Sequence, residues 1–274
     1  MIRLIAADLD GTLLGADGRI APNDVEALTQ ARACGVDLVI ATGRPARWLS
    51  CLRPLTALSP TVLISNGAAE FDLASGTIVR RSPVPTADVV GVGAALRQAF
   101  PGVLLALEQG LGFGCEPGWF EHAHTSMVPE GDDGETPVAA WETLIEQVRP
   151  VVKILALAAN RRAEDFAEAA AAVIGARGMV THSAFSPDAA LLEISAPGVS
   201  KASALAGICR ARGINPGQVA AFGDMPNDAS MLAFAGHGFA MADAHPSLRA
   251  RFTVVGAHTA GGVGNTVREL LAQP

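Results

Sequence analysis

Two acidic residues, Asp8 and Asp10, directly follow an apolar run from Ile2 to Ala7 near the start of the chain. Like charges this close repel each other, and neither side chain gains packing energy from the position. Paired carboxylates do chemistry when a cation lies between them, or when one attacks a substrate while the other moves a proton. The pair therefore predicts a reactive site at the end of a buried strand.

Polar groups also follow three other apolar runs of the chain. Ligands of open α/β proteins bind at the carboxyl ends of the strands, so we expect these groups to form one site if the runs are neighbouring strands. Carboxylate oxygens in small number suit Mg²⁺, whose coordination is completed by waters and a substrate phosphate. The groups are Thr42, Gly43 and Arg44 after 36–41, Asn66 after 61–65, and Asp224, Asn227 and Asp228 after 218–222, with Lys201 arriving separately.

The elements that must position these residues are short buried strands alternating with helices. Continuous apolar runs such as 4–7 and 36–41 are typical of parallel strands covered on both faces. A helix is expected between them, with Asn23 or Asp24 as its N-cap. The pattern predicts an α/β layered fold, and it returns late in the chain, at 201–213 and 218–224.

The middle of the chain has a different character. Its predicted strands and helices suggest a small α+β domain inserted into the α/β domain, so that the larger domain is discontinuous. We expect a catalytic core of residues 1–82 and 188–274 and an inserted cap of residues 83–187. Glu116 and Lys153 are the weaker candidates for substrate contacts from this cap.

Four sequence motifs resemble, in order, those of the haloacid dehalogenase superfamily of phosphohydrolases. DLDGT (8–12), ATGR (41–44), Lys201 in GVSK and GDMPND (223–228) carry the resemblance. SNGA (65–68) and FAMADA (239–244) are similar to the Cof-type subfamily, and the long interval between the second and third motifs leaves room for a C2-type cap. One departure is Gly261, which stands where members usually carry an acidic residue before Gly-Val. The resemblance implies a doubly wound, Rossmann-like parallel sheet with the inserted cap.

Asp8 is expected to act as a nucleophile that forms an aspartyl-phosphate, which divides one difficult hydrolysis into two easier steps. Asp10 would be the general acid and base, and the resemblance places its backbone carbonyl on Mg²⁺ together with Asp8 and Asp224. Lys201 would neutralise charge on the phosphoryl group. The remaining predicted roles are phosphoryl binding for Thr42 and Gly43, substrate contact for Arg44, Asn66 and Asn227, and orientation of Lys201 or of the metal's waters for Asp228 and Asn227.

The sequence thus predicts a Mg²⁺-dependent phosphatase of small phosphate monoesters, with sugar phosphates as the typical substrates. A phosphomutase or phosphotransferase using the same intermediate, and a non-catalytic protein that binds a phosphometabolite, remain alternatives. A net charge of −7 argues against nucleic acid as a partner. Four scattered cysteines and the lack of a long apolar run predict a cytoplasmic protein without membrane association, as a monomer or homodimer.

Overall fold

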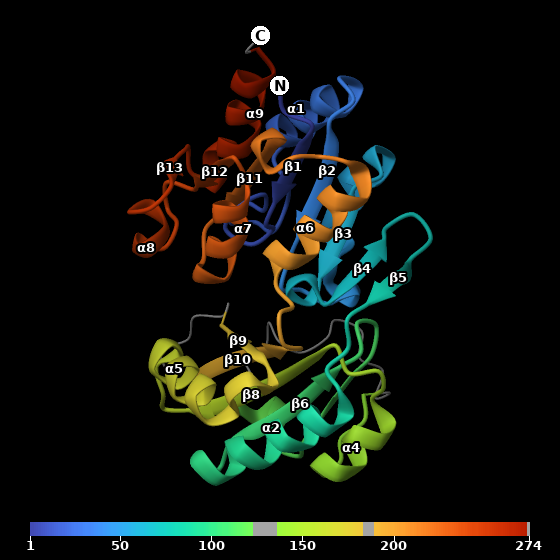
Figure 1. Ribbon diagram of the computed structural model, residues 1–274, viewed down its shortest axis with the longest axis vertical. Helices are drawn as coiled ribbons and strands as arrows, with labels where there is room; N and C mark the ends of the chain where they lie inside the picture. The colour runs from blue at the N-terminus through green and yellow to red at the C-terminus, as the bar shows by residue number, and fades with distance from the viewer. Residues whose placement is uncertain (123–135, 183–188, 273–274) are drawn as a thin grey trace. The chain divides into compact units, whose positions relative to one another are not determined.

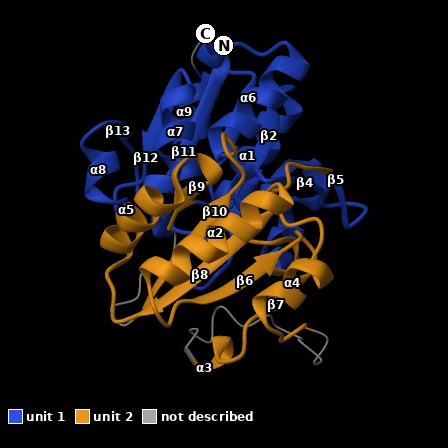
Figure 2. Cartoon of the chain, turned by 60° about the horizontal axis from the view of Figure 1, so that its bottom comes forward, with its two compact units in different colours: residues 1–43, 49–79, 200–274 blue, residues 44–48, 80–199 orange. Residues whose placement is uncertain are grey.

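The computed structural model describes residues 1–122, 136–182 and 189–272 (Figure 1). The chain forms two compact units, coloured separately in Figure 2. The first contains residues 1–43, 49–79 and 200–274, and the second contains residues 44–48 and 80–199. The chain therefore leaves the first unit and returns to it, as expected for an inserted domain.

The first unit is built on a sheet whose described strands follow the order β13-β12-β11-β1-β2-β3-β4-β5. β1 pairs in parallel with β11 on one side and β2 on the other. All residues of β1 are buried, as in a sheet covered on both faces. The strands are β1 (Leu4–Ala7), β2 (Asp37–Ala41), β3 (Thr61–Ile64), β4 (Ala69–Asp72), β5 (Thr77–Arg81), β11 (Val219–Gly223), β12 (His237–Ala240) and β13 (Thr253–Val254).

Helices α1 and α9 of this unit pack against each other, and α6 packs beside α7. The predicted cap of α1 is wrong: its N-cap is Ala21, and Pro22 opens the helix. Asp24 is buried and its Oδ1 instead accepts a hydrogen bond from the Gly264 N–H, 2.7 Å away at the start of α9. The helices are α1 (Pro22–Ala33), α6 (Lys201–Arg212), α7 (Ala229–Phe234), α8 (Pro246–Arg249) and α9 (Gly262–Ala272).

The second unit contains an antiparallel sheet in the order β7-β6-β8-β10-β9. Alternate strand residues enter two separate apolar clusters, one with α2, α4 and α5 and the other with Trp119. The elements are β6 (Leu104–Glu108), β7 (Phe113–Cys115), β8 (Lys153–Ala159), β9 (Met179–Thr181), β10 (Ala189–Ser195), α2 (Thr86–Ala99), α3 (Trp119–His122), α4 (Trp141–Gln147) and α5 (Ala163–Ile174).

The predicted fold class, a parallel α/β core with an inserted α+β domain, is confirmed by this architecture. The boundaries differ from the expected ones. Residues 44–48 and 80–82 belong to the second unit, and so do residues 189–199, because β10 is hydrogen-bonded between β8 and β9. Within the described ranges, no helix is long and apolar enough to span a membrane.

Candidate active site

The end of β1 brings Asp8 to the carboxyl edge of the parallel sheet. The Asp8 N–H donates to the Phe222 carbonyl of β11 at 3.1 Å, which continues the pairing of the two strands by one residue. The chain then turns sharply, because the carbonyl of Leu9 accepts hydrogen bonds from the backbone N–H groups of Leu13 and Leu14. The Asp8 side chain is buried as a result.

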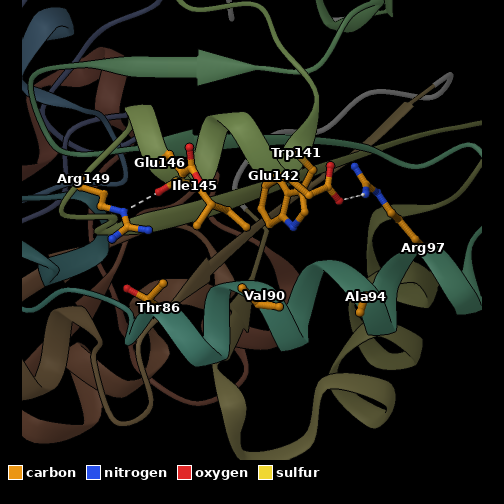
Figure 3. Close-up of a pocket in the computed structure, with 9 residues that line it drawn as sticks. All are labelled: Thr86, Val90, Ala94, Arg97, Trp141, Glu142, Ile145, Glu146 and Arg149. Carbon is orange, nitrogen blue, oxygen red and sulfur yellow. Dashed lines mark hydrogen bonds and ion pairs between the residues drawn. The ribbon is translucent and has the colours of Figure 1, made fainter.

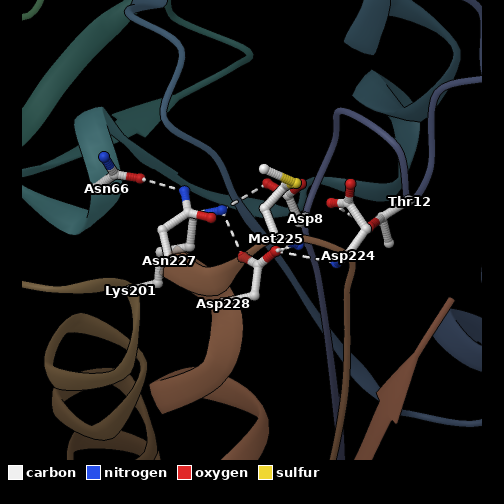
Figure 4. Close-up of polar contacts among 8 residues, drawn as sticks. All are labelled: Asp8, Thr12, Asn66, Lys201, Asp224, Met225, Asn227 and Asp228. Carbon is white, nitrogen blue, oxygen red and sulfur yellow. Dashed lines mark hydrogen bonds and ion pairs between the residues drawn. The ribbon is translucent and has the colours of Figure 1, made fainter. Parts of the chain in front are cut away.

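Lys201 meets Asp8 from the first turn of α6. Ser200 caps this helix by accepting a hydrogen bond from the Ser203 N–H, and the Ser203 hydroxyl oxygen accepts from the Ser200 N–H in return. The Lys201 Nζ lies 2.6 Å from Asp8 Oδ1 and 2.7 Å from Asp228 Oδ1. Figure 4 shows the ammonium group between the two carboxylates. The site therefore joins residues from both ends of the sequence.

Asp228 holds the loop after β11 in place. Its Oδ2 accepts hydrogen bonds from the backbone N–H groups of Asp224 and Met225, each at 3.1 Å, while its Oδ1 accepts from Lys201. Gly223 permits this arrangement, since a Cβ there would lie 2.5 Å from the Cβ of Asp228. Asp228 thus fixes the backbone on which Asp224 is carried.

Gly11 and Thr12 of the DLDGT motif contact Asp224 directly. Gly11 has a φ of 71°, and a Cβ at this position would lie 2.2 Å from Asp224 Oδ2. Only glycine therefore combines this backbone conformation with this close approach. The Thr12 hydroxyl donates to Asp224 Oδ1 at 3.4 Å. Thr12 was not among the predicted site residues, although its place in the motif could have indicated it.

Three carboxylates, Asp8, Asp224 and Asp228, each offer an oxygen within 4.8 Å of the others. With one ammonium among them, the group carries excess negative charge. Burial, followed by the charges of Asp228 and Asp224, raises the pKa of Asp8 well above its usual value despite the opposing effect of Lys201. Burial and Asp228 likewise raise the pKa of Asp224 to about 7. A hard divalent cation such as Mg²⁺ fits this oxygen donor set and would offset the excess charge.

Asp10 differs from these three carboxylates in being exposed. It forms an isolated β-bridge with Leu14, and its charge contributes to raising the pKa of Asp8. The Asp10 side chain is therefore open to solvent, while its charge acts on the buried Asp8.

Thr42 and Asn66 connect the ends of β2 and β3. The Thr42 N–H donates to the Leu63 carbonyl at 2.8 Å, and the Asn66 N–H donates to the Thr42 carbonyl at 2.9 Å. Asn66 has a φ of 58°, a conformation that is uncommon for a residue with a side chain. Its Oδ1 accepts from Asn227 Nδ2 at 3.2 Å (Figure 4). These contacts link three of the predicted strand ends within the first unit.

Gly67 lies where the end of β3 approaches the start of α6. It has a φ of 90°, and a Cβ there would lie 2.6 Å from the Ser200 carbonyl oxygen. The start of α6, which carries Lys201, can approach the end of β3 so closely because Gly67 has no side chain. Arg44, by contrast, belongs to the second unit, where its Nη1 donates to the Trp48 carbonyl at 3.2 Å.

The second unit has a cavity of about 340 Å³ between α2 and α4 (Figure 3). Its lining includes Val90, Trp141 and Ile145, and Arg97 pairs with Glu142 at its edge. None of the strand-end residues predicted from the sequence lines it. The carboxylate cluster of the first unit is therefore the better candidate for the site of chemistry.

Residues 5–266 match the family of haloacid dehalogenase-like hydrolases, and the chain belongs to this family. It is 27% identical to the pyridoxal phosphate phosphatase YbhA of Escherichia coli K12, over 99% of this chain and 96% of that protein. It is also 27% identical to the HMP-PP phosphatase of Escherichia coli strain 55989, over 91% of this chain and 88% of that protein. The predicted superfamily and the prediction of a phosphatase are confirmed.

Solved structures show the same fold. BT1666 of Bacteroides thetaiotaomicron, a phosphatase of this superfamily, superposes with a TM-score of 0.80 at 22% identity, covering 98% of this chain and 95% of that one. The subclass IIB sugar phosphatase BT4131 gives a TM-score of 0.78 at 23% identity, covering 98% of both chains. At this identity the likeness concerns the fold alone.

Proposed function

We propose that the protein is a Mg²⁺-dependent phosphatase that hydrolyses small phosphate monoesters through a phosphorylated Asp8. The observation that carries this proposal is the buried Lys201, held 2.6 Å from Asp8 and 2.7 Å from Asp228 within a group of carboxylates that has excess negative charge. A purely structural ion pair would not need the additional Asp224. A site that receives a divalent cation and a phosphoryl group needs such an additional carboxylate.

Asp8, Asp224 and the backbone carbonyl of Asp10 are the residues proposed to hold Mg²⁺. When bound, the ion would withdraw charge from the phosphoryl oxygens, so that an anionic nucleophile can approach them. Asp228 is proposed as a positioning residue, because its two oxygens hold Lys201 and the backbone of Asp224 at once. Its contacts with both groups support this role.

In the first step, an oxygen of Asp8 would attack phosphorus, and the bond from phosphorus to the leaving oxygen would break. Asp10 would give its proton to that oxygen. In the second step, Asp10 would remove a proton from water, which attacks phosphorus and releases inorganic phosphate and free Asp8. The exposure of Asp10 supports its exchange of protons with solvent.

Lys201, Thr42 and the Gly43 N–H would hold the phosphoryl oxygens while charge redistributes between the attacking and leaving groups. Asn66 and Asn227 are proposed to contact the substrate from the same edge of the sheet. The hydrogen bond between them fixes both amide groups, and this supports a contact with the substrate in one defined orientation. Arg44 is proposed to contact the substrate from the second unit.

The substrates are proposed to be small phosphorylated metabolites. The relatives are named for pyridoxal phosphate and HMP-PP, and one structural neighbour is named a sugar phosphatase. These names share a phosphoryl group on a small polar molecule. We place this activity in the cytoplasm, where such metabolites occur.

The test is phosphate release from pyridoxal 5′-phosphate, several sugar phosphates and an aryl phosphate, with Mg²⁺ and with excess chelator. Metal-dependent release that is lost in Asp8→Asn is the expected result. Formation of an isomerised sugar phosphate without inorganic phosphate would point to a mutase. Tight binding of a phosphometabolite without any product would favour the non-catalytic alternative and overturn the proposal.

A further inference from the structure

The backbone of Asp224 is held on both sides within the first unit. Its N–H donates to Asp228 Oδ2 at 3.1 Å, and its carbonyl accepts a hydrogen bond from the His245 N–H at 2.7 Å. Asp228 belongs to the carboxylate cluster around Lys201. His245 instead ends residues 241–245, the β12 loop, which follows β12. A second segment of the chain therefore also holds the backbone that carries the Asp224 carboxylate.

Both ends of the β12 loop contact the end of β11. The Met241 N–H donates to the Gly223 carbonyl at 3.2 Å, and the His245 N–H donates to the carbonyl of the next residue, Asp224. Asp243 lies between these two contacts in the chain. A shift of Asp243 would therefore be passed through the short loop to the backbone of Asp224.

Asp243 joins the β12 loop to a third segment. Its Oδ2 is hydrogen-bonded to His258 Nδ1. A carboxylate oxygen accepts, so Nδ1 carries the hydrogen and donates it. The Ala242 N–H of the same loop donates to the Gly256 carbonyl at 3.5 Å. The side chains of His258 and Asp243 are 21% and 39% exposed. Exposed pairs of this kind add little to the stability of a fold.

The segment that carries His258 is packed against two elements of the first unit. The Val255 N–H donates to the Ala240 carbonyl at 3.0 Å, which extends the pairing of β12 with β13. At the start of α9, a Cβ on Gly262 would lie 2.2 Å from the Gly256 carbonyl oxygen, so α9 approaches this segment closely. The sheet and α9 together give Asp243 a fixed partner.

We propose that Asp243 and His258 are positioning residues for Asp224. The pair connects the β12 loop to the segment beside α9, and His245 at the end of that loop holds the Asp224 carbonyl. Without the pair, the loop could shift and carry the Asp224 carboxylate with it. A small divalent cation such as Mg²⁺ needs its oxygen ligands at defined positions. The inference rests on the proposed function, and neither residue is proposed to touch the cation or the substrate.

The test compares variants in which the donor at position 258 is removed or restored. His258→Leu removes it, whereas His258→Asn supplies an amide N–H as many bonds from the backbone as Nδ1. Asp243→Ala removes the acceptor. Arg32→Ala is the matched control, because it breaks an ion pair of similar exposure with Asp37, at 2.8 Å. Asp37 opens β2, at the end of the parallel strands opposite to Asp224.

Exchange of the His245 amide hydrogen is measured by NMR on the protein without metal, and Mg²⁺ affinity by calorimetry. In His258→Leu and Asp243→Ala, this amide should exchange at least about tenfold faster, because its hydrogen bond to Asp224 opens more often. Mg²⁺ should bind about tenfold more weakly, while the melting temperature falls by no more than about 4 °C. His258→Asn should recover both values, and Arg32→Ala should keep them.

Wild-type Mg²⁺ affinity in His258→Leu would overturn the inference and leave the proposed function standing. Faster exchange throughout the strands of the first unit, with a larger fall in melting temperature, would make the pair a structural one and overturn the inference as well. Failure of His258→Asn to restore either value would contradict the role of the hydrogen bond. If the wild-type protein binds no Mg²⁺, the proposed function and this inference fail together.

Discussion

Two buried lysines, one in each unit, are each paired with two carboxylates, but a different fourth charged residue lies near each pair. Lys201 lies between Asp8 and Asp228, at 2.6 and 2.7 Å, and Lys153 lies between Glu108 and Glu193, at 3.1 and 2.8 Å. The carboxylates raise the pKa of both lysines although burial opposes this. An ion pair by itself therefore does not distinguish a reactive site from a structural one.

The fourth charged residue distinguishes the two clusters. Among the residues that the structure describes, Asp224 joins the Lys201 cluster and gives it excess negative charge, whereas Arg47 joins the Lys153 cluster and brings it to two cations and two carboxylates. A balanced cluster can remain buried without a metal ion. A cluster with excess carboxylates favours a divalent cation; burial first, and the neighbouring carboxylates second, raise the pKa values of Asp8 and Asp224. The net charge of a buried cluster thus indicates its chemistry better than the presence of a lysine.

Replacement of each lysine by methionine should separate the two clusters most strongly. Lys201→Met is expected to lower turnover about a thousandfold, because Asp8 and Asp228 would repel each other and the phosphoryl oxygens would lose a counter-charge. Lys153→Met should instead destabilise the protein by about 3–5 kcal/mol, with turnover per folded molecule reduced by less than about tenfold. Urea unfolding and phosphate release measure both quantities. Equal losses of turnover would contradict the comparison.

Gly11→Ala should weaken metal binding by disturbing Asp224. The added Cβ would lie 2.2 Å from Asp224 Oδ2, so the carboxylate must move. We expect the Mg²⁺ concentration for half-maximal phosphate release to rise about 10- to 100-fold. Gly18→Ala is the matched control, because Gly18 has a φ of 70° and no atom within 4 Å of an added Cβ. If both variants keep the wild-type Mg²⁺ requirement, Asp224 is not the ligand.

The pH dependence of Mg²⁺ binding provides a third test. The pKa of Asp224 is raised to about 7, so protons compete with the cation at and below this pH. Mg²⁺ affinity measured by calorimetry should be about tenfold weaker at pH 6 than at pH 8. Asp224→Asn should bind weakly at both values and show a smaller dependence on pH, with Asp8 as the remaining ligand whose pKa is raised. A wild-type affinity that does not change between pH 6 and 8 would argue against the role of Asp224.

The smallest predicted effect comes from replacing Asp24, and it concerns only the free energy of unfolding. Burial raises its pKa, with the Gly264 N–H and Arg268 opposing. The folded state thus binds the proton more tightly, and stability falls as pH rises from the pKa of the unfolded state to that of the folded state. Asn can keep the bond to Gly264 without ionising, so Asp24→Asn should gain about 1 kcal/mol at pH 7 per unit of pKa difference. Urea unfolding of the wild-type protein and Asp24→Asn between pH 3.5 and 7 tests this prediction. An equal fall in the free energy of unfolding of both proteins as pH rises would contradict it.

The strand-end groups could be predicted from the sequence because parallel strands end at one edge of the sheet. This brought Asp8, Thr42, Asn66 and Asp224 into one expected site. The partner of Asp24 could not be predicted, since Gly264 lies 240 residues away and only the packing of α1 against α9 joins them. The charge balance of the Lys153 cluster was equally hidden, because it depends on the register of β6 and β10 against β8.

Arg47 illustrates a second limit of sequence analysis. In the sequence, Arg47 stands in a short segment after ATGR, where an arginine is ordinarily exposed to solvent. Its burial between Trp48 and Phe113 and its contact with Glu108 depend on the antiparallel sheet that forms later in the chain. The sequence motifs mark the residues proposed to do chemistry, whereas no motif indicates the buried position of Arg47.

The most direct test of the account is to trap phosphate on Asp8. The protein is mixed with substrate and Mg²⁺, quenched in acid within milliseconds, and analysed by peptide mass spectrometry. We expect a phosphorylated peptide containing Asp8 that is lost with hydroxylamine, with chelator and in Asp8→Asn. Full phosphate release by Asp8→Asn, with no phosphorylated Asp8 in the wild-type protein, would contradict the central claim that the acid-rich cluster activates this carboxylate.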